Sequence, residues 1–203
     1  MLITNIKPAT VSDQYFNQLA DELLNHSYLQ SKNSKYRLIE IEFYLKNTIH
    51  NDEYTHCNED QLLFHTFYFH KFKTGTYKAG AFKGMDITLG DTDKKVYFGV
   101  LIRSVQNSVT REIIEGPCNT VNCLLADCEC ASIMDLTNGS NLNIFDNDSG
   151  FKLCFSNKLI QHQIYAGPRI GLSEKYPLYL NKPYRYAIRK EKLKKKKTTL
   201  VEI

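Results

Sequence analysis

Residues 36–45 read YRLIEIEFYL, and two classes of side chain alternate along them with the two-residue period of a β-strand. Successive side chains leave a strand on opposite faces. One face of the predicted strand is therefore apolar (Ile39, Ile41, Phe43, Leu45), and the other carries Leu38, Glu40, Glu42 and Tyr44. The stretch predicts a β-strand that buries at least one face in a core.

Other elements are predicted outward from this strand. Ser12 is placed to cap a helix whose apolar residues, Phe16 to Leu24, recur at helical spacing. Residues 96–105 (VYFGVLIRSV) read as a strand buried on both faces, which Arg103 interrupts. Further strands are expected at residues 86–89, 151–155 and 184–189, a short helix at about 117–126, and a loop at 138–150.

Length and composition bound the protein class. The 203 residues favour one domain, and 42% hydrophobic with 24% charged residues is an ordinary globular balance. We see neither an apolar run long enough to cross a membrane nor a secretory signal, and expect an intracellular protein without a membrane partner. The six cysteines are then expected as free thiols. A zinc site is the weaker alternative, because Cys118, Cys123, Cys128 and Cys130 lack paired Cys-x2-Cys spacing.

The net charge of +4 comes from the last fifteen residues. Residues 189–203 hold seven of the 26 basic residues but two of the 22 acidic ones, so the remainder carries a net charge of −1. We expect residues 1–188 to form the domain and residues 189–203 to be a flexible lysine-rich tail. Removing residues 190–203 should then leave the fold intact and weaken nucleic-acid binding, unless the tail has no role in binding.

Several residues are candidates for chemistry. Glu40 and Glu42 leave one strand face about 6.5–7 Å apart, so they form either a carboxylate pair or part of a solvent-exposed face. Arg103 needs an anionic partner if it is buried, either in a structural ion pair or on a ligand. Residues 71–90 interleave glycines with lysines, as a phosphate-binding segment or as an exposed hairpin. His65 and His70 are expected on opposite faces of a strand, which argues against a shared metal.

The order of these motifs resembles the alkyladenine (3-methyladenine) DNA glycosylase family. Residues 38–45 (LIEIEFYL) match the family strand Ile-Val-Glu-Thr-Glu-Ala-Tyr-Leu, and Asp52-Glu53-x-x-His56 matches its Asp-Glu-x-x-His. The collinear match continues through Gly75-Thr76, Gly84-Met85, Arg103, Gly116-Pro117, Arg169-Ile-Gly171 and residues 182–186, and spans about residues 12–188.

This resemblance implies a single α+β domain with a curved antiparallel β-sheet flanked by helices. It also implies a monofunctional enzyme without metal or cofactor that flips a damaged base out of DNA and cleaves its N-glycosidic bond in base excision repair. Glu42 corresponds to the general base, Tyr44 to the base-stacking tyrosine, His56 to the pocket histidine, and Arg103 to an arginine near the water and the DNA backbone. We expect these four to converge in one cleft of a monomer, nuclear if eukaryotic and otherwise cytoplasmic.

The chain departs from the family pattern at the recognition positions. Lys83, beside Phe82, stands where the family inserts a tyrosine into the duplex, and both are expected to bind substrate at the cleft rim. Gly80 replaces a second pocket aromatic, and Gly90 lies near the position of a family asparagine. The substrate is therefore DNA, RNA or a nucleoside. Two alternatives remain open: a non-catalytic nucleic-acid-binding protein of this fold, and a nucleosidase acting on a small molecule.

Overall fold

Strand β2 (Lys35–Lys46) is the central element of the sheet and contains the alternating stretch. It pairs antiparallel with β5 (Tyr97–Asn107) along its whole length, with β9 (Arg185–Ile188) at its middle, and with β1 (Ser27–Ser31) at its start. Residues 38, 40 and 41 of β2 mark a bulge in its register with β5. A bulge bends a strand and redirects side chains, and this one lies directly beside Glu40 and Arg103.

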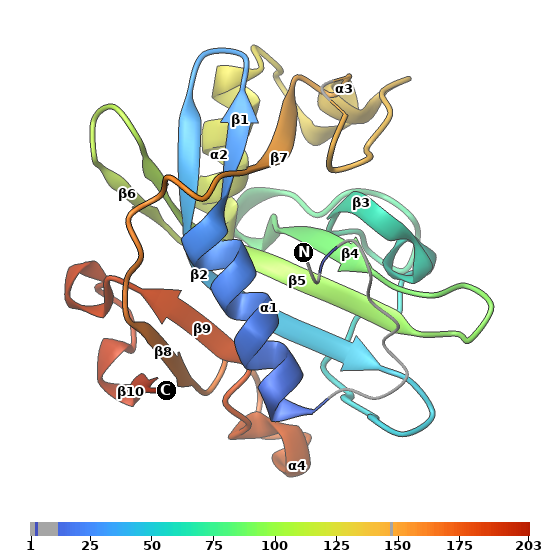
Figure 1. Ribbon diagram of the computed structural model, residues 1–203. Coiled ribbons are helices and arrows are strands. Elements are labelled where there is room, and N and C mark those ends of the chain that lie inside the picture. The colour runs from blue at the N-terminus through green and yellow to red at the C-terminus, as the bar shows by residue number, and fades with distance from the viewer. Residues whose placement is uncertain (1–2, 4–11, 147) are drawn as a thin grey trace.

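The computed structural model describes Ile3, residues 12–146 and residues 148–203. They form an α+β domain with one antiparallel sheet (Figure 1). Its main order is β10-β8-β9-β2-β5-β4-β3, with β1 joining β2 to β7, and β6 beside β5. The remaining strands are β3 (Phe64–Phe69), β4 (Met85–Leu89), β6 (Ile113–Glu115), β7 (Phe151–Phe155), β8 (Ile164–Gly167) and β10 (Val201–Glu202). The helices are α1 (Asp13–His26), α2 (Pro117–Asp127), α3 (Ile133–Thr137) and α4 (Pro177–Leu180), with short 3-10 turns at Glu59–Leu62, Gly80–Phe82, Lys190–Lys192 and Lys197–Thr199.

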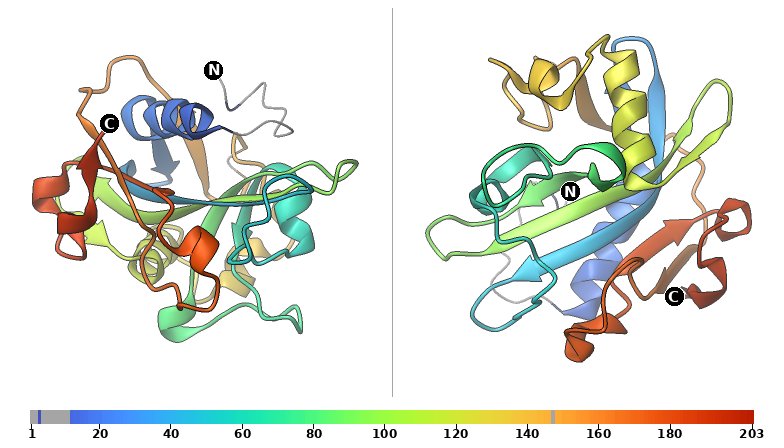
Figure 2. Two further views of the ribbon diagram at one scale, coloured as in Figure 1. Left: turned by 90° about the horizontal axis from the view of Figure 1, so that it is seen from below. Right: turned by 180° about the vertical axis from the view of Figure 1, so that it is seen from behind.

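Helix α1 covers one face of the central strands (Figure 2). The Ser12 hydroxyl accepts a hydrogen bond from the Tyr15 N–H, as the capping prediction requires. Phe16 on α1 stacks on Phe43 of β2 with ring centroids 4.7 Å apart, so the predicted apolar faces meet here. The glutamates of β2 consequently lie on the opposite side of the sheet, where the candidate site forms.

The predicted helix and strands agree with the observed elements to within one or two residues at most ends. The sequence analysis did not predict β1, β6, β8, β10, α3 and α4, which are short. The glycosylase-like form of the fold remains a prediction. Among the described residues, no helix has the length and apolar character that a membrane crossing requires.

The prediction that residues 189–203 form a flexible tail is wrong, because these residues are packed against the domain. Leu193 and Leu200 are each 1% exposed, and β10 pairs with β8. The fully buried Arg185 guanidinium donates to the carbonyl oxygens of Lys195 and Lys196 at 2.9 and 3.0 Å. Two leucines and backbone groups therefore anchor the segment, and its lysine content concealed this.

Candidate active site

Glu40 and Glu42 are buried side chains, 1% and 0% exposed, so the alternative of a solvent-exposed face is excluded. The Oε1 atom of Glu40 accepts from Arg185 Nε at 2.5 Å, and its Oε2 accepts from the Ser104 hydroxyl at 2.6 Å. Burying a carboxylate is costly unless it is paired and hydrogen-bonded. Glu40 meets this requirement and thereby ties β2 to β5 and β9.

Three groups hold Glu42 in place. The Tyr44 hydroxyl donates to Oε2 at 2.8 Å, the Ile170 N–H donates to Oε1 at 2.8 Å, and Arg103 Nη1 lies 3.3 Å from Oε1. Burial raises the pKa of Glu42, and the Arg103 charge and the two hydrogen bonds oppose that shift without cancelling it. A carboxylate with a raised pKa is a stronger base near neutral pH.

Arg103 is 6% exposed and pairs with both glutamates. Its Nε lies 3.6 Å from Glu40 Oε1, beyond hydrogen-bond distance, and has no hydrogen-bond partner within the described chain. The structure therefore supplies the carboxylate partners that the sequence required.

A cavity of about 100 Å³ lies beside this cluster. It is lined by residues from six parts of the chain: Tyr44, Tyr54, His56, Gln61, His70, Asp86, Leu101 and Leu172. Tyr44 joins the two features, because its ring lines the cavity while its hydroxyl contacts Glu42. Four of the predicted residues thus lie close together. Tyr44 and His56 line the cavity, and Glu42 and Arg103 lie next to Tyr44, outside the cavity lining.

A second carboxylate faces the cavity on the same sheet row as Glu42. Leu101 pairs with Glu42 on one side and with Asp86 on the other. Neighbouring strands lie about 4.8 Å apart, so the two acidic residues are separated by about 9.5 Å at their Cα atoms. The cavity therefore lies between two carboxylates of one sheet, on strands β2 and β4, which flank β5.

Asp86 is 1% exposed and accepts hydrogen bonds from both sides. His70 Nε2 lies 2.8 Å from its Oδ1, and Gln61 Nε2 donates to its Oδ2 at 3.2 Å. The His56 and His70 rings meet edge to face with centroids 4.5 Å apart. Asp86 therefore orients His70, and His70 supports His56.

His56 is the exposed member of this chain of contacts. Desolvation of its ring and the adjacent His70 lower its pKa to about 4, although water at the exposed side screens part of that effect. Lys78 Nζ lies 3.3 Å from His56 Nε2. We therefore expect a neutral imidazole at pH 7, whose Nδ1 can hydrogen-bond a ligand in the cavity.

Arg169 supports the cavity from behind Tyr44. Its guanidinium forms a two-point ion pair with Asp52, at 2.6 and 3.0 Å, and both side chains are fully buried. The guanidinium carbon lies 4.4 Å from the Tyr44 ring centroid. This cation–π contact holds the Tyr44 ring in its orientation at the border of the cavity.

Sequence reasoning missed Asp86, His70 and Gln61 as cavity residues, and Arg169 with Asp52 as their support. Two glycines in the sequence are related to this arrangement. An added Cβ at Gly99 would lie 2.3 Å from Asp86 Oδ2, and one at Gly84 would lie 2.6 Å from the His70 ring. These glycines make room for the pair. Strand alternation alone does not show which side chains meet across three strands.

The structure does not bring Phe82 and Lys83 into the cavity wall. Phe82 is 73% exposed, and Lys83 Nζ donates to Asn122 Oδ1 on α2 at 2.5 Å. Their role as substrate contacts remains a prediction. The six cysteines are free thiols, and the described residues contain no group of three or more His, Cys, Asp or Glu arranged to hold a metal ion.

Replacement of Gly99 by alanine tests the packing of this cavity. The new methyl group would overlap Asp86 and Gln61, so we expect Gly99→Ala to lower the free energy of unfolding by about 1–3 kcal/mol in urea titration. Asp86→Ala removes the overlapped group. The double variant should therefore lose less stability than the sum of the two single variants, and strict additivity would contradict this close contact.

Comparison with known proteins adds one relative. The chain is 54% identical to "Uncharacterized protein L759" of Acanthamoeba polyphaga mimivirus over 214 aligned positions, which cover 100% of this chain and 99% of the viral protein. The chain belongs to the family of that viral protein. No protein-family profile matches the sequence. The relative's name assigns it no activity, so any functional conclusion depends on the geometry of the site.

Proposed function

We propose that the protein hydrolyses an N-glycosidic bond in a nucleic acid, with excision of a modified DNA base as the foremost case. The supporting observation is Glu42, a buried carboxylate of raised pKa held between Tyr44, Arg103 and the Ile170 N–H beside a small polar cavity. The resemblance of residues 38–45 to the glycosylase strand points to the same chemistry.

The proposed reaction is a single displacement. Glu42 takes a proton from a water molecule whose oxygen attacks C1′ of the sugar, and the electron pair of the broken C–N bond leaves with the base. Arg103, whose Nη1 lies 3.3 Å from Glu42 Oε1, stabilises the ionised carboxylate. Tyr44 stacks on the base, and neutral His56 hydrogen-bonds it. The residues supply the base and the positioning groups, and the scheme uses no cofactor.

The size of the cavity restricts what enters it. At about 100 Å³ it is smaller than an engineered cavity of about 150 Å³ that admits benzene, so it does not enclose a whole planar ring. A base fits in part, while sugar and phosphates stay outside. Gly80, at the position of the family's second aromatic, supplies no stacking face of its own, a loss of about 1–3 kcal/mol of base binding.

The test is a base-release assay on oligonucleotides that carry alkylated, deaminated or oxidised bases. Glu42→Gln should lower the rate about a hundredfold or more, because the amide cannot accept the water proton. The rate of the unmodified protein should rise with pH through the pKa of Glu42, above the ordinary glutamate range, because only the ionised form acts as a base.

Glu202→Gln is the matched control, since Glu202 is an exposed glutamate on β10. It should leave both the rate and the pH profile unchanged. Equal base release by the Glu42→Gln and unmodified proteins would contradict the role of Glu42. Free nucleosides in the same assay separate a nucleosidase from an enzyme that needs a strand.

A second candidate function is nucleic-acid binding without catalysis. It is favoured by the contacts of Glu42, since both carboxylate oxygens are engaged and the side chain is fully buried. In that case Glu42 stabilises the sheet. No base release from any lesion, combined with a large loss of stability in Glu42→Gln, would favour this function over hydrolysis.

A further inference from the structure

A groove of about 480 Å³ separates the β5–β6 hairpin from the C-terminal segment, residues 189–203. Its wall contains four cationic side chains, Arg111, Arg189, Lys192 and Lys194, together with Gln106, Glu112, Ile113 and Glu115. Lys195 and Lys196 are exposed residues that follow Lys194 along the chain. This groove lies apart from the residues that line the candidate cavity.

We propose that this basic groove binds phosphate groups. The inference goes beyond the hydrolase proposal and does not depend on it. Arginine forks and lysine ammonium groups are the side chains that recognise phosphate, and several cations along one groove suit an anion with more than one phosphate.

Arg189 is held in position before any ligand binds. Its backbone adopts a left-handed conformation with φ of 53°. Its Nη1 donates to Gln106 Oε1 at 2.6 Å, and Gln106 Nε2 in turn donates to the Arg111 carbonyl oxygen at 2.7 Å. Gln106 is 3% exposed. A buried amide thus fixes one guanidinium and the backbone beside another, which reduces the entropy cost of binding.

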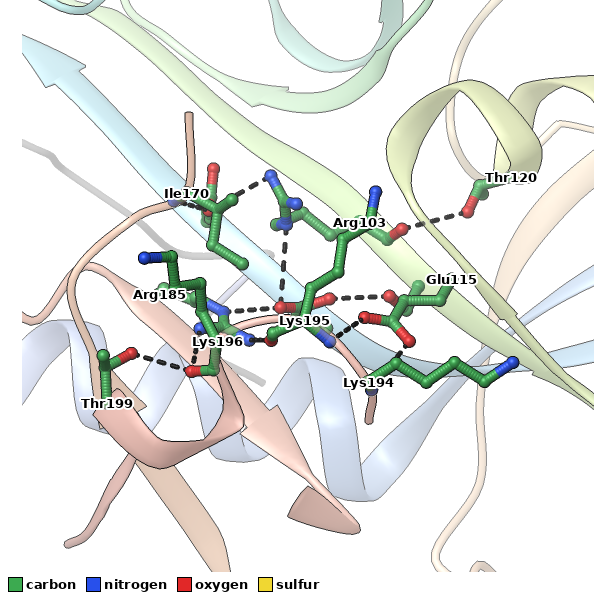
Figure 3. Close-up of polar contacts among 12 residues, drawn as sticks. Arg103, Glu115, Thr120, Ile170, Arg185, Lys194, Lys195, Lys196 and Thr199 are labelled. Carbon is green, nitrogen blue, oxygen red and sulfur yellow. Dashed lines mark hydrogen bonds and ion pairs between the residues drawn. The ribbon is translucent and has the colours of Figure 1, made fainter. Parts of the chain in front are cut away.

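Glu112 and Glu115 share the groove wall, but among the described residues they form no ion pair with its cations. In the described part of the chain, Arg111, Arg189, Lys192 and Lys194 form no ion pair, whereas the buried Arg103, Arg169 and Arg185 each pair with a carboxylate. Glu115, at the end of β6, accepts hydrogen bonds from the backbone N–H groups of Lys194 and Lys195 at 2.9 and 2.8 Å (Figure 3). These contacts hold the backbone and leave the lysine side chains free.

Arg37 lies close enough to the groove to be affected by two of its cations. It lies opposite Gln106 in the sheet. Burial, followed by the charges of Arg189 and Arg111, lowers the pKa of Arg37 to about 10. Like charges that destabilise one another in this way would be stabilised by a bound anion.

Four lysines offer a clean test, because Lys192, Lys194, Lys195 and Lys196 are exposed and their ammonium groups form no hydrogen bond or ion pair with the described residues. We expect the variant with all four changed to Gln to fold normally. Its affinity for a labelled oligothymidylate of about 15 nucleotides should fall about tenfold or more at about 50 mM salt. The slope of log K against log salt should become shallower by about 0.7 for each phosphate that the variant no longer neutralises.

The control changes Lys32, Lys94, Lys158 and Lys175 to Gln, four exposed lysines outside the groove. A second arm measures inorganic pyrophosphate by calorimetry. The proposal is supported if the groove variant loses binding and the control variant keeps it. Such a loss with the oligothymidylate identifies a phosphodiester strand as the ligand. Such a loss with pyrophosphate identifies a free polyphosphate. Equal binding by groove variant and unmodified protein in both arms, or an equal loss in the control, would overturn it. Base release is measured in a separate assay, so the hydrolase proposal and the phosphate-binding proposal can be rejected independently of each other.

Discussion

Deletion of residues 190–203 is expected to unfold the protein or to lower its free energy of unfolding by at least about 5 kcal/mol. Leu193 and Leu200 are each 1% exposed, and truncation of one buried leucine costs about 2–5 kcal/mol. The deletion also removes the carbonyl oxygens that satisfy Arg185, whose guanidinium is fully buried. An unsatisfied buried charge adds a further penalty.

Urea unfolding followed by circular dichroism measures this loss. The four-lysine groove variant is the matched control, because it removes the charge of the segment but keeps both leucines and the backbone contacts. Its unfolding midpoint should stay close to that of the unmodified protein. A truncated protein with an unchanged midpoint would show that the segment contributes nothing to stability, as a flexible tail would.

The second large effect is expected from Asp52→Asn, which should cost about 3–5 kcal/mol. The substitution leaves the Arg169 guanidinium fully buried without a counter-charge. Loss of this anchor should also release the Tyr44 ring that Arg169 holds at 4.4 Å. Any base release should therefore decline along with stability.

Asp91→Asn is the control for this substitution. Asp91 pairs with Lys94 at 3.5 Å, and the Lys94 side chain is 51% exposed. Solvent screens an exposed pair of this kind, so the expected change in stability is small. Equal losses in the two variants would contradict the importance of burial for the Asp52–Arg169 pair.

The local elements were predictable because their signals are local. Ser12 caps α1 and Phe16 packs on Phe43, as helical and strand periods require. The strand alternation also placed Glu40, Glu42 and Tyr44 together on one face. The meeting of Arg103 with Glu42 was anticipated from the need of a buried guanidinium for an anion and from the family resemblance.

The cavity wall was less predictable, because its members come from separate strands and loops. Asp86 reads as an ordinary strand residue until its pairing with Leu101 places it level with Glu42. His70 and His56 are fourteen positions apart in the sequence, yet their rings touch. Only the register of β4 on β5, and the space left by Gly99, bring these groups together.

The sequence by itself determined the helix, the main strands and the polar face of β2, because hydrophobic period and capping act over a few neighbouring residues. The tertiary structure decided whether the polar face is covered and whether the lysine-rich segment is packed. Those outcomes depend on Ile170, Arg185 and Glu115, which bind partners about 80 to 145 positions away. The burial of a charged group depends on what packs over it, and composition does not show which distant segment does so.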